Sequence, residues 1–90
     1  MTEEAQQSLI EFPCAFPIKV MGRAEGGFTQ VVLDIVQRHD PGFDAASIET
    51  RPSREGNYLS VTVTIQAKSR EHLDEVYQAL CDHPMVTMVL

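Results

Sequence analysis

Polar and apolar residues alternate almost without interruption between positions 58 and 67. The odd positions are apolar and the even ones are mostly hydroxyl-bearing: Leu59, Val61, Val63, Ile65 and Ala67 against Tyr58, Ser60, Thr62, Thr64 and Gln66. Successive side chains of a strand point to opposite faces, so this pattern predicts a strand with one face on a core and the other exposed. Such two-sidedness is typical of antiparallel sheets.

Two other segments have helical spacing. The first begins at Phe28 and is stopped by Asp40-Pro41-Gly42; the second is capped by Ser69 and stopped by Asp82-His83-Pro84. Their apolar positions recur every three or four residues: Phe28, Val31, Val32, Ile35 and Val36 in the first, and Leu73, Val76, Tyr77 and Leu80 in the second. Each segment is therefore predicted to be an amphipathic helix with one buried face.

Three more strands are predicted from weaker patterns. The first runs to Gly22 and begins at Ile18, or accepts Pro17 as its first residue, because proline cannot donate to a sheet ladder. The second covers about residues 45–51, with Ala46 and Ile48 pointing inward. The last is the uncharged apolar segment of residues 85–90.

Proline and glycine mark the turn in the middle of the chain. Pro52 ends the second strand, which suits an edge position, and the loop of residues 53–56 places Gly56 in a left-handed conformation. The resulting order of strand, helix, strand, strand, helix, strand predicts an α+β fold, the ferredoxin-like βαββαβ plait. We expect a four-stranded antiparallel sheet of order 4-1-3-2 with both helices on one face. Residues 1–11 are predicted to be a flexible arm before a single domain of residues 12–90.

Charge narrows the classes of partner. The formal net charge is −6, and the seven Lys and Arg residues are scattered along the sequence without a basic stripe. An acidic chain of this kind repels phosphate backbones and anionic lipid surfaces, so we expect no nucleic acid and no membrane as partners. The polar start Met-Thr-Glu-Glu, with no apolar run after it, argues against a secretory signal, and we expect a cytoplasmic protein with reduced cysteines.

No motif specifies a reaction or a cofactor. The loop from Gly22 to Gly27 lacks both the dinucleotide-binding spacing and the phosphate-loop ending. Two cysteines and three histidines do not show the paired short spacing of a zinc site: Cys14, Cys81, His39, His72 and His83. We therefore expect no metal, no cofactor and no catalytic residue. The alternative is a small enzyme for acyl or phosphoryl transfer or hydrolysis that uses Arg23, Lys19 or Asn57.

Several segments together carry a resemblance to a known family. They are Phe12-Pro13, Lys19-Val20-Met21-Gly22, Val36-Gln37-Arg38-His39, Pro41-Gly42, Gly56-Asn57-Tyr58, Ser60-Val61-Thr62-Val63-Thr64-Ile65 and Met88-Val89-Leu90. Over roughly residues 10–90 the chain resembles the YbeD-like family of small bacterial proteins. The resemblance implies the plait described above, a relation to ACT-type regulatory domains, and a link to lipoate metabolism drawn from gene neighbourhood. It implies no catalytic residue.

The open face of the predicted sheet is the candidate interaction face. We expect it to combine Lys19, Met21, Tyr58, Ser60, Thr62, Thr64, Thr87 and Val89. The competing candidate is the uncharged edge strand of residues 85–90, which would invite pairing with another chain unless residues 1–17 fold back over it. The function predicted from these features is regulatory or adaptor-like and non-catalytic, through a protein partner, self-association, including a possible homodimer, or a small ligand.

Overall fold

The computed structural model describes residues 11–90 of the chain. Four strands and two α-helices follow one another in the predicted order, with a short 3-10 helix between the first helix and the second strand. Their bounds are β1 Cys14–Arg23, α2 Phe28–His39, η1 Ala45–Ser47, β2 Glu49–Pro52, β3 Tyr58–Ala67, α3 Arg70–Asp82 and β4 Val86–Val89. The arm predicted for residues 1–11 lies outside the described residues except for Glu11.

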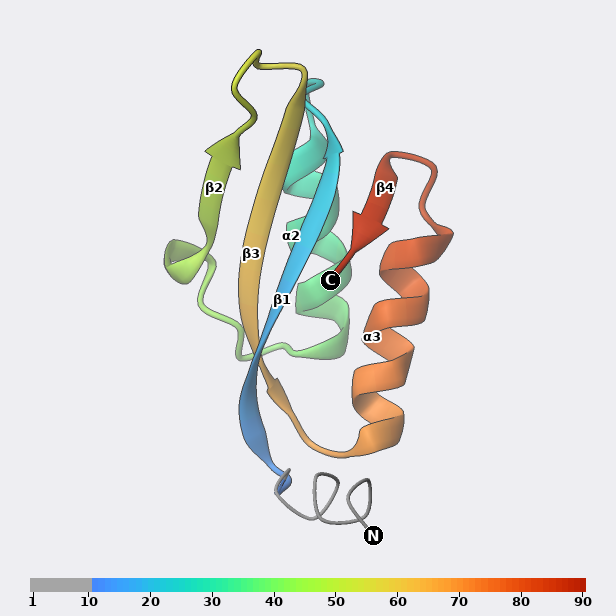
Figure 1. The fold of residues 1–90 in the computed structure, drawn as a ribbon. Coiled ribbons are helices and arrows are strands. Elements are labelled where there is room, and N and C mark those ends of the chain that lie inside the picture. The colour runs from blue at the N-terminus through green and yellow to red at the C-terminus, as the bar shows by residue number, and fades with distance from the viewer. Residues whose placement is uncertain (1–10) are drawn as a thin grey trace, which may run out of the picture.

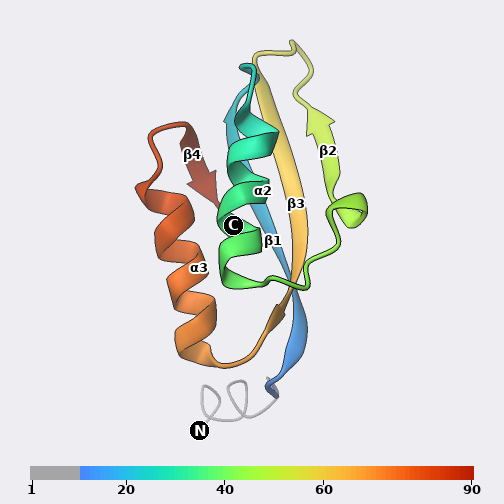
Figure 2. The ribbon, with the colours of Figure 1, turned by 180° about the vertical axis from the view of Figure 1, so that it is seen from behind.

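The strands form one antiparallel sheet in the order β2-β3-β1-β4. This is the predicted order 4-1-3-2, and the fold is the ferredoxin-like plait. Figure 1 looks onto the side of the sheet that the helices leave open, with β1 and β3 at its centre. Figure 2 shows both helices on the opposite side, α2 across the central strands and α3 nearer β4.

The alternation along β3 is confirmed residue by residue. Val61, Val63 and Ala67 have no exposed surface and Ile65 has 1 %. Thr64 and Gln66 are exposed, and Thr62 is partly so. The burial of four apolar side chains on one face explains why these ten residues adopt a strand in the middle of the sheet rather than at its edge.

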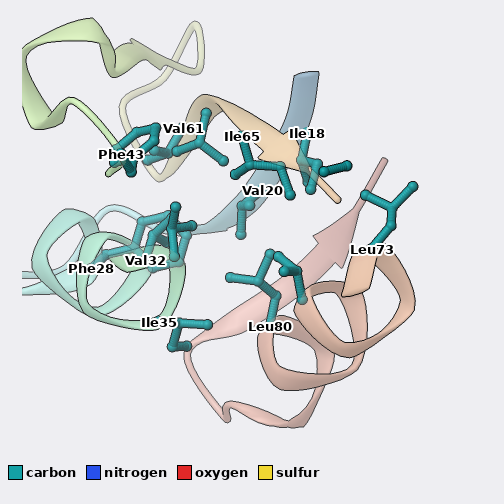
Figure 3. Close-up of a cluster of buried hydrophobic side chains, with 14 residues drawn as sticks. Ile18, Val20, Phe28, Val32, Ile35, Phe43, Val61, Ile65, Leu73 and Leu80 are labelled. Atoms are coloured by element: carbon teal, nitrogen blue, oxygen red, sulfur yellow. The ribbon is translucent and has the colours of Figure 1, made fainter. Parts of the chain in front are cut away.

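One hydrophobic core fills the space between the sheet and the two helices. Strand residues such as Ile18, Val20 and Val61 meet helix residues such as Phe28 and Leu80 across it (Figure 3). The start of α3 matches its sequence signal, since Ser69 Oγ accepts a hydrogen bond from the His72 N–H at 3.1 Å. Gly27, with φ 91°, precedes α2 as its N-cap. Gly56 has φ 79°, which confirms the left-handed position predicted for the hairpin loop.

The prediction for the first strand is wrong at its start. β1 begins at Cys14, and Pro17 lies inside it, opposite Thr64 of β3. Lys19 exchanges backbone hydrogen bonds with Leu90 beside β4, so the nitrogen of Pro17, two residues earlier, points to the same side. There it lies beyond the residues that pair with β4, and no strand within residues 11–90 needs its missing N–H.

The prediction for residues 45–51 is wrong in its first half. Residues 45–47 form η1, and strand β2 covers only Glu49–Pro52. The cause is local: the Asp44 carboxylate accepts the Ala46 N–H at 3.0 Å, and the Ser47 hydroxyl donates to the Asp44 carbonyl at 2.7 Å. Such side-chain bonds compete with a sheet ladder for the same backbone. Ala46 is consequently exposed, while Ile48 packs against the core as predicted.

Candidate functional site

The side of the sheet away from the helices carries the candidate site. We call it the sheet face and define it by the side chains that the strand registers direct there: Lys19, Met21 and Arg23 of β1, Glu49 and Arg51 of β2, Tyr58, Ser60, Thr62 and Thr64 of β3, Met88 of β4, and Leu90 just after it. Residues directly opposite one another on neighbouring strands share a face. The registers therefore determine which side chains of β1, β2 and β4 share the exposed face of β3.

Most of the predicted interaction residues lie on the sheet face, but Val89 does not. Its partner in β1 is Val20, which is fully buried, and Val89 packs against the core. Thr87 is exposed and is the residue left without a partner where the pairing slips between Met21 and Gly22. Because residues 85–90 are nearly all apolar, their sequence does not distinguish the two registers, and a shift of one residue exchanges the faces.

The correction places Met88 and Leu90 on the sheet face in place of Val89. Met88 lies opposite Met21, and Leu90 lies opposite Lys19. The three large hydrophobic side chains that are well exposed within residues 11–90 are Tyr58 at 43 %, Met88 at 50 % and Leu90 at 61 %. All three belong to this one face, and none belongs to a helix.

The fold also gathers cations that the sequence had scattered. Arg51 lies far in the chain from Lys19 and Arg23, which are both in β1, but the strand registers bring all three to the sheet face. Glu49 is the one acidic side chain among the residues that define it.

Tyr58 lines three open hollows at one end of this face. The largest, about 410 Å³, lies between Arg23, Glu25 and Asn57 and also touches Tyr58. A second, of about 340 Å³, joins Arg23 and Tyr58 to Met85 and Thr87; the third, of about 180 Å³, joins Tyr58 to Met21 and Arg51. A fourth hollow of about 230 Å³ lies between Lys19, Glu49 and Arg51.

The alternative enzymatic residues are brought together only in part. Arg23 and Asn57 line the same hollow, and the Ala24 N–H donates to the Asn57 carbonyl at 2.9 Å. Lys19 lines a different hollow. Among the described residues that line the Arg23 hollow, there is no serine, cysteine or histidine to form a nucleophile–base pair.

The glycine-rich segment from Gly22 to Gly27 serves the packing of the fold. A Cβ at Gly22 would collide with the carbonyl oxygen of Met85 and with the ring of Phe28, so this glycine allows β1, α2 and the start of β4 to approach one another. At Gly26, by contrast, the space is open.

The cysteines and histidines do not converge. Within residues 11–90 no three His, Cys, Asp or Glu side chains are placed to hold a metal ion. His72 is occupied by the backbone: its Nδ1 accepts the Lys68 N–H at 3.1 Å, and its Nε2 lies 2.6 Å from the His39 carbonyl oxygen. It therefore joins the end of α2 to the start of α3.

Two other titratable side chains, Asp40 and Tyr77, take part in the hydrogen bonding and packing of the fold. Asp40, 7 % exposed, accepts the Gln66 N–H through Oδ2 at 3.0 Å, which occupies the edge of β3 where β2 does not reach. Burial raises the pKa of the Tyr77 hydroxyl above its ordinary value, and the neighbouring Cys81 raises it further. Tyr77 packs against the core from α3, which lies on the opposite side of the sheet from the sheet face.

These features define a class: a small ferredoxin-like plait whose open sheet face is decorated with hydroxyl, apolar and cationic groups. Comparison with known proteins shows the family. Residues 7–90 match the family described as "Protein of unknown function (DUF493)", and the chain belongs to that family. This is the YbeD-like family that the sequence segments predicted.

The relatives are bacterial proteins of the same size. The chain is 62 % identical to the UPF0250 protein NE1487 of Nitrosomonas europaea over the full length of both. It is 57 % identical over 84 residues to a UPF0250 protein of Janthinobacterium sp. (strain Marseille), covering 93 % of this chain and 92 % of that one. The solution structure of protein HP0495 from H. pylori has the same fold, with a TM-score of 0.70 at 14 % identity over 90 % of this chain and 85 % of that one.

No helix within residues 11–90 has the length and apolar character needed to cross a membrane.

Proposed function

We propose that this protein is a non-catalytic regulatory or adaptor module whose recognition surface is the sheet face. One observation carries the proposal: the three well-exposed large hydrophobic side chains within residues 11–90 all lie on the side of the sheet that the helices leave open. A contiguous apolar patch rimmed by polar groups is typical of an interaction site. Met21 lies beside Met88 within that patch.

The competing surface, the edge of β4, is less suited to recognition. β4 is only four residues long, and short edge strands are one of the ways in which proteins avoid pairing with other chains. The sheet face offers instead two strands of ten residues side by side. We therefore favour the face over the edge.

The proposal includes three kinds of occupant, namely a protein partner, a second copy of the chain, and a small ligand. It also includes a cytoplasmic location and, from the family resemblance alone, a link to lipoate metabolism. The hollows around Tyr58 are open and shallow, which suits a protein surface or segment better than an enclosed small molecule.

Affinity purification of the tagged chain from its native cell, together with sedimentation analysis, tests the proposal. Met88→Asp and Thr62→Asp should abolish the capture of a partner or the self-association, while Gln37→Asp on the exposed side of α2 should leave it intact. All three variants must first give the circular dichroism spectrum of the parent chain. A monomer without any captured partner would refute the protein-partner and self-association forms of the proposal, and loss of binding only in Gln37→Asp would refute the assignment of the sheet face.

One observation favours a second candidate function. Arg23 and Asn57 line one hollow of about 410 Å³, and a guanidinium group is suited to bind a carboxylate or phosphate oxygen pair. The candidate is a small enzyme acting on an acyl or phosphoryl substrate. Hydrolysis of p-nitrophenyl phosphate and p-nitrophenyl acetate should then be detectable and should disappear in the Arg23→Ala, Asn57→Ala double variant. Activity that survives both substitutions would exclude these residues.

A further inference from the structure

The sheet face and the rest of the molecule differ in sign of charge. Among the side chains that define the sheet face, Lys19, Arg23 and Arg51 against Glu49 leave a surplus of two positive charges, whereas the whole chain has a formal net charge of −6. The remaining surface therefore carries the negative charge, including the exposed Asp74 and Glu75 of α3. Opposite potentials on two sides of a small domain steer a charged partner to one of them.

The cations stand beside the exposed apolar side chains. Arg23 lies directly opposite Tyr58 across the β1–β3 pair, and Arg51 lines a hollow with Tyr58 from the β2 side. Lys19 lies opposite Leu90. Each exposed apolar side chain thus has a positively charged side chain on a neighbouring strand. A partner that fits must present carboxylates next to hydrophobic side chains.

The same arrangement disfavours a second copy of the chain as the occupant. Two sheet faces placed against each other would bring two positive surfaces together, and like charges across an interface cost affinity.

We propose that the sheet face binds an acidic segment of a partner protein in which hydrophobic side chains alternate with carboxylates. The inference rests on the proposed function and names the chemistry of the partner. The guanidinium forks of Arg23 and Arg51 bind carboxylates of the segment, and Tyr58, Met21 and Met88 take its apolar side chains. Glu25 and Glu49 at the margins of the hollows oppose it.

The test uses the full chain labelled with ¹⁵N and a synthetic peptide of sequence Glu-Leu-Glu-Glu-Phe-Glu-Glu-Leu-Glu. Amide shifts should change in the sheet face, around Lys19, Arg51 and Tyr58, and the affinity should fall as salt is raised. A matched peptide with lysine at every glutamate position should produce no such changes. Changes in amide shifts of the chain that are confined to its helices, or equal binding of the lysine peptide, would overturn the inference.

Charge-reversed variants provide the quantitative readout. The Arg23→Glu, Arg51→Glu double variant should bind the acidic peptide roughly tenfold more weakly, or weaker still. The Arg38→Glu, Arg70→Glu double variant changes the net charge equally from exposed positions on α2 and α3, and should change the affinity by about twofold or less. Glu25→Gln and Glu49→Gln should each strengthen binding by about twofold. Equal weakening by the two double variants would overturn the inference.

Failure of this inference is distinguishable from failure of the proposed function. If Met88→Asp abolishes capture of the native partner while the Arg23→Glu, Arg51→Glu double variant retains it, the sheet face is the binding surface and the acidic character of the partner is wrong. A sedimentation dimer that is lost in Met88→Asp would likewise keep the surface and replace the partner with a second copy.

Discussion

The two faces of strand β3 are built from alternate residues of one ten-residue segment, yet they have different surroundings. Toward the helices, Val61, Val63 and Ile65 are sealed in a core together with side chains of α2 and α3. Away from them, Tyr58 and Thr64 are exposed, and Tyr58 lies opposite Arg23 of β1. The difference follows from the placement of both helices on one side of the sheet (Figure 2).

This comparison shows where stability and recognition can be separated in a small domain. A change on the helix side acts on packing and costs free energy of folding. A change on the open side acts on solvated groups and leaves the fold largely unaffected. The face available for binding is thus the one where substitution is tolerated.

The most direct way to break the comparison is to place a charge on each face in turn. Val63→Asp should put an unpaired carboxylate in the core and unfold the domain, at a cost of about 3–5 kcal/mol or more. Thr62→Asp, one residue away, should remain folded and change the free energy of unfolding by less than about 1 kcal/mol. Urea denaturation followed by circular dichroism measures both. Equal effects would show that the faces are wrongly assigned.

The crowding of the helix side can be tested at a single glycine. Gly22→Ala should destabilise the domain by about 2–3 kcal/mol, because the added methyl group meets the Met85 carbonyl oxygen and the Phe28 ring. Gly26→Ala is the control, since open space surrounds that position. A shift of the thermal midpoint that is the same for both variants would contradict the close approach of β1, α2 and the segment before β4.

The buried Asp40 sharpens the comparison at the edge of the sheet. Asp40→Ala should cost about 1–2 kcal/mol, because it leaves the Gln66 N–H without its acceptor. It should also speed amide exchange at Gln66. The Asp34 carboxylate is exposed and accepts a hydrogen bond from Gln30, so Asp34→Ala should change stability by less than about 0.5 kcal/mol. Unchanged exchange at Gln66 would rule out the capping role.

The smallest expected effect is on the stability of the domain at high pH, through Tyr77 on the helix side of the sheet. Burial raises the pKa of Tyr77 in the folded chain above the value near 10 of an unfolded tyrosine. The folded state then holds the proton more tightly, so the stabilisation is complete below about pH 10 and is lost as the pH rises through the folded-state pKa. Tyr77→Phe should reduce the fall in stability above about pH 10, and Tyr58→Phe serves as a comparison on the open face. Superimposable pH profiles of parent and Tyr77→Phe would refute the shift.

Much of the fold was predictable because its signals are local. The alternation of β3 and the apolar stripe of α2 each report which side of an element is buried. Ser69 and Gly56 mark a helix start and a turn through the chemistry of their own side chains or backbone. These features depend on neighbours within a few residues, and all were confirmed.

The mistakes arose where a distant neighbour, or a competing local bond, decides the outcome. Pro17 lies within β1 because its nitrogen faces a side where the pairing with β4 has already ended. Val89 lies toward the core because β4 pairs with β1 in one of two registers that a nearly all-apolar segment does not distinguish. The turn η1 could have been predicted from Asp44, since aspartate commonly caps such turns and does so here.

The sequence by itself determined the kind of layers this protein has, because the period of two along β3 and of three to four along the helices states which side of each element seeks a core. It also determined where most elements stop, through glycine, proline and capping residues. Only the tertiary structure decided what the open face is made of. Arg51 is separated in the chain from Lys19 and Arg23 by α2 and η1, and Met88 and Leu90 reach that face only through the pairing of β4 with β1. Strand order and register place residues from four segments side by side, and no pattern within a single segment specifies such an arrangement.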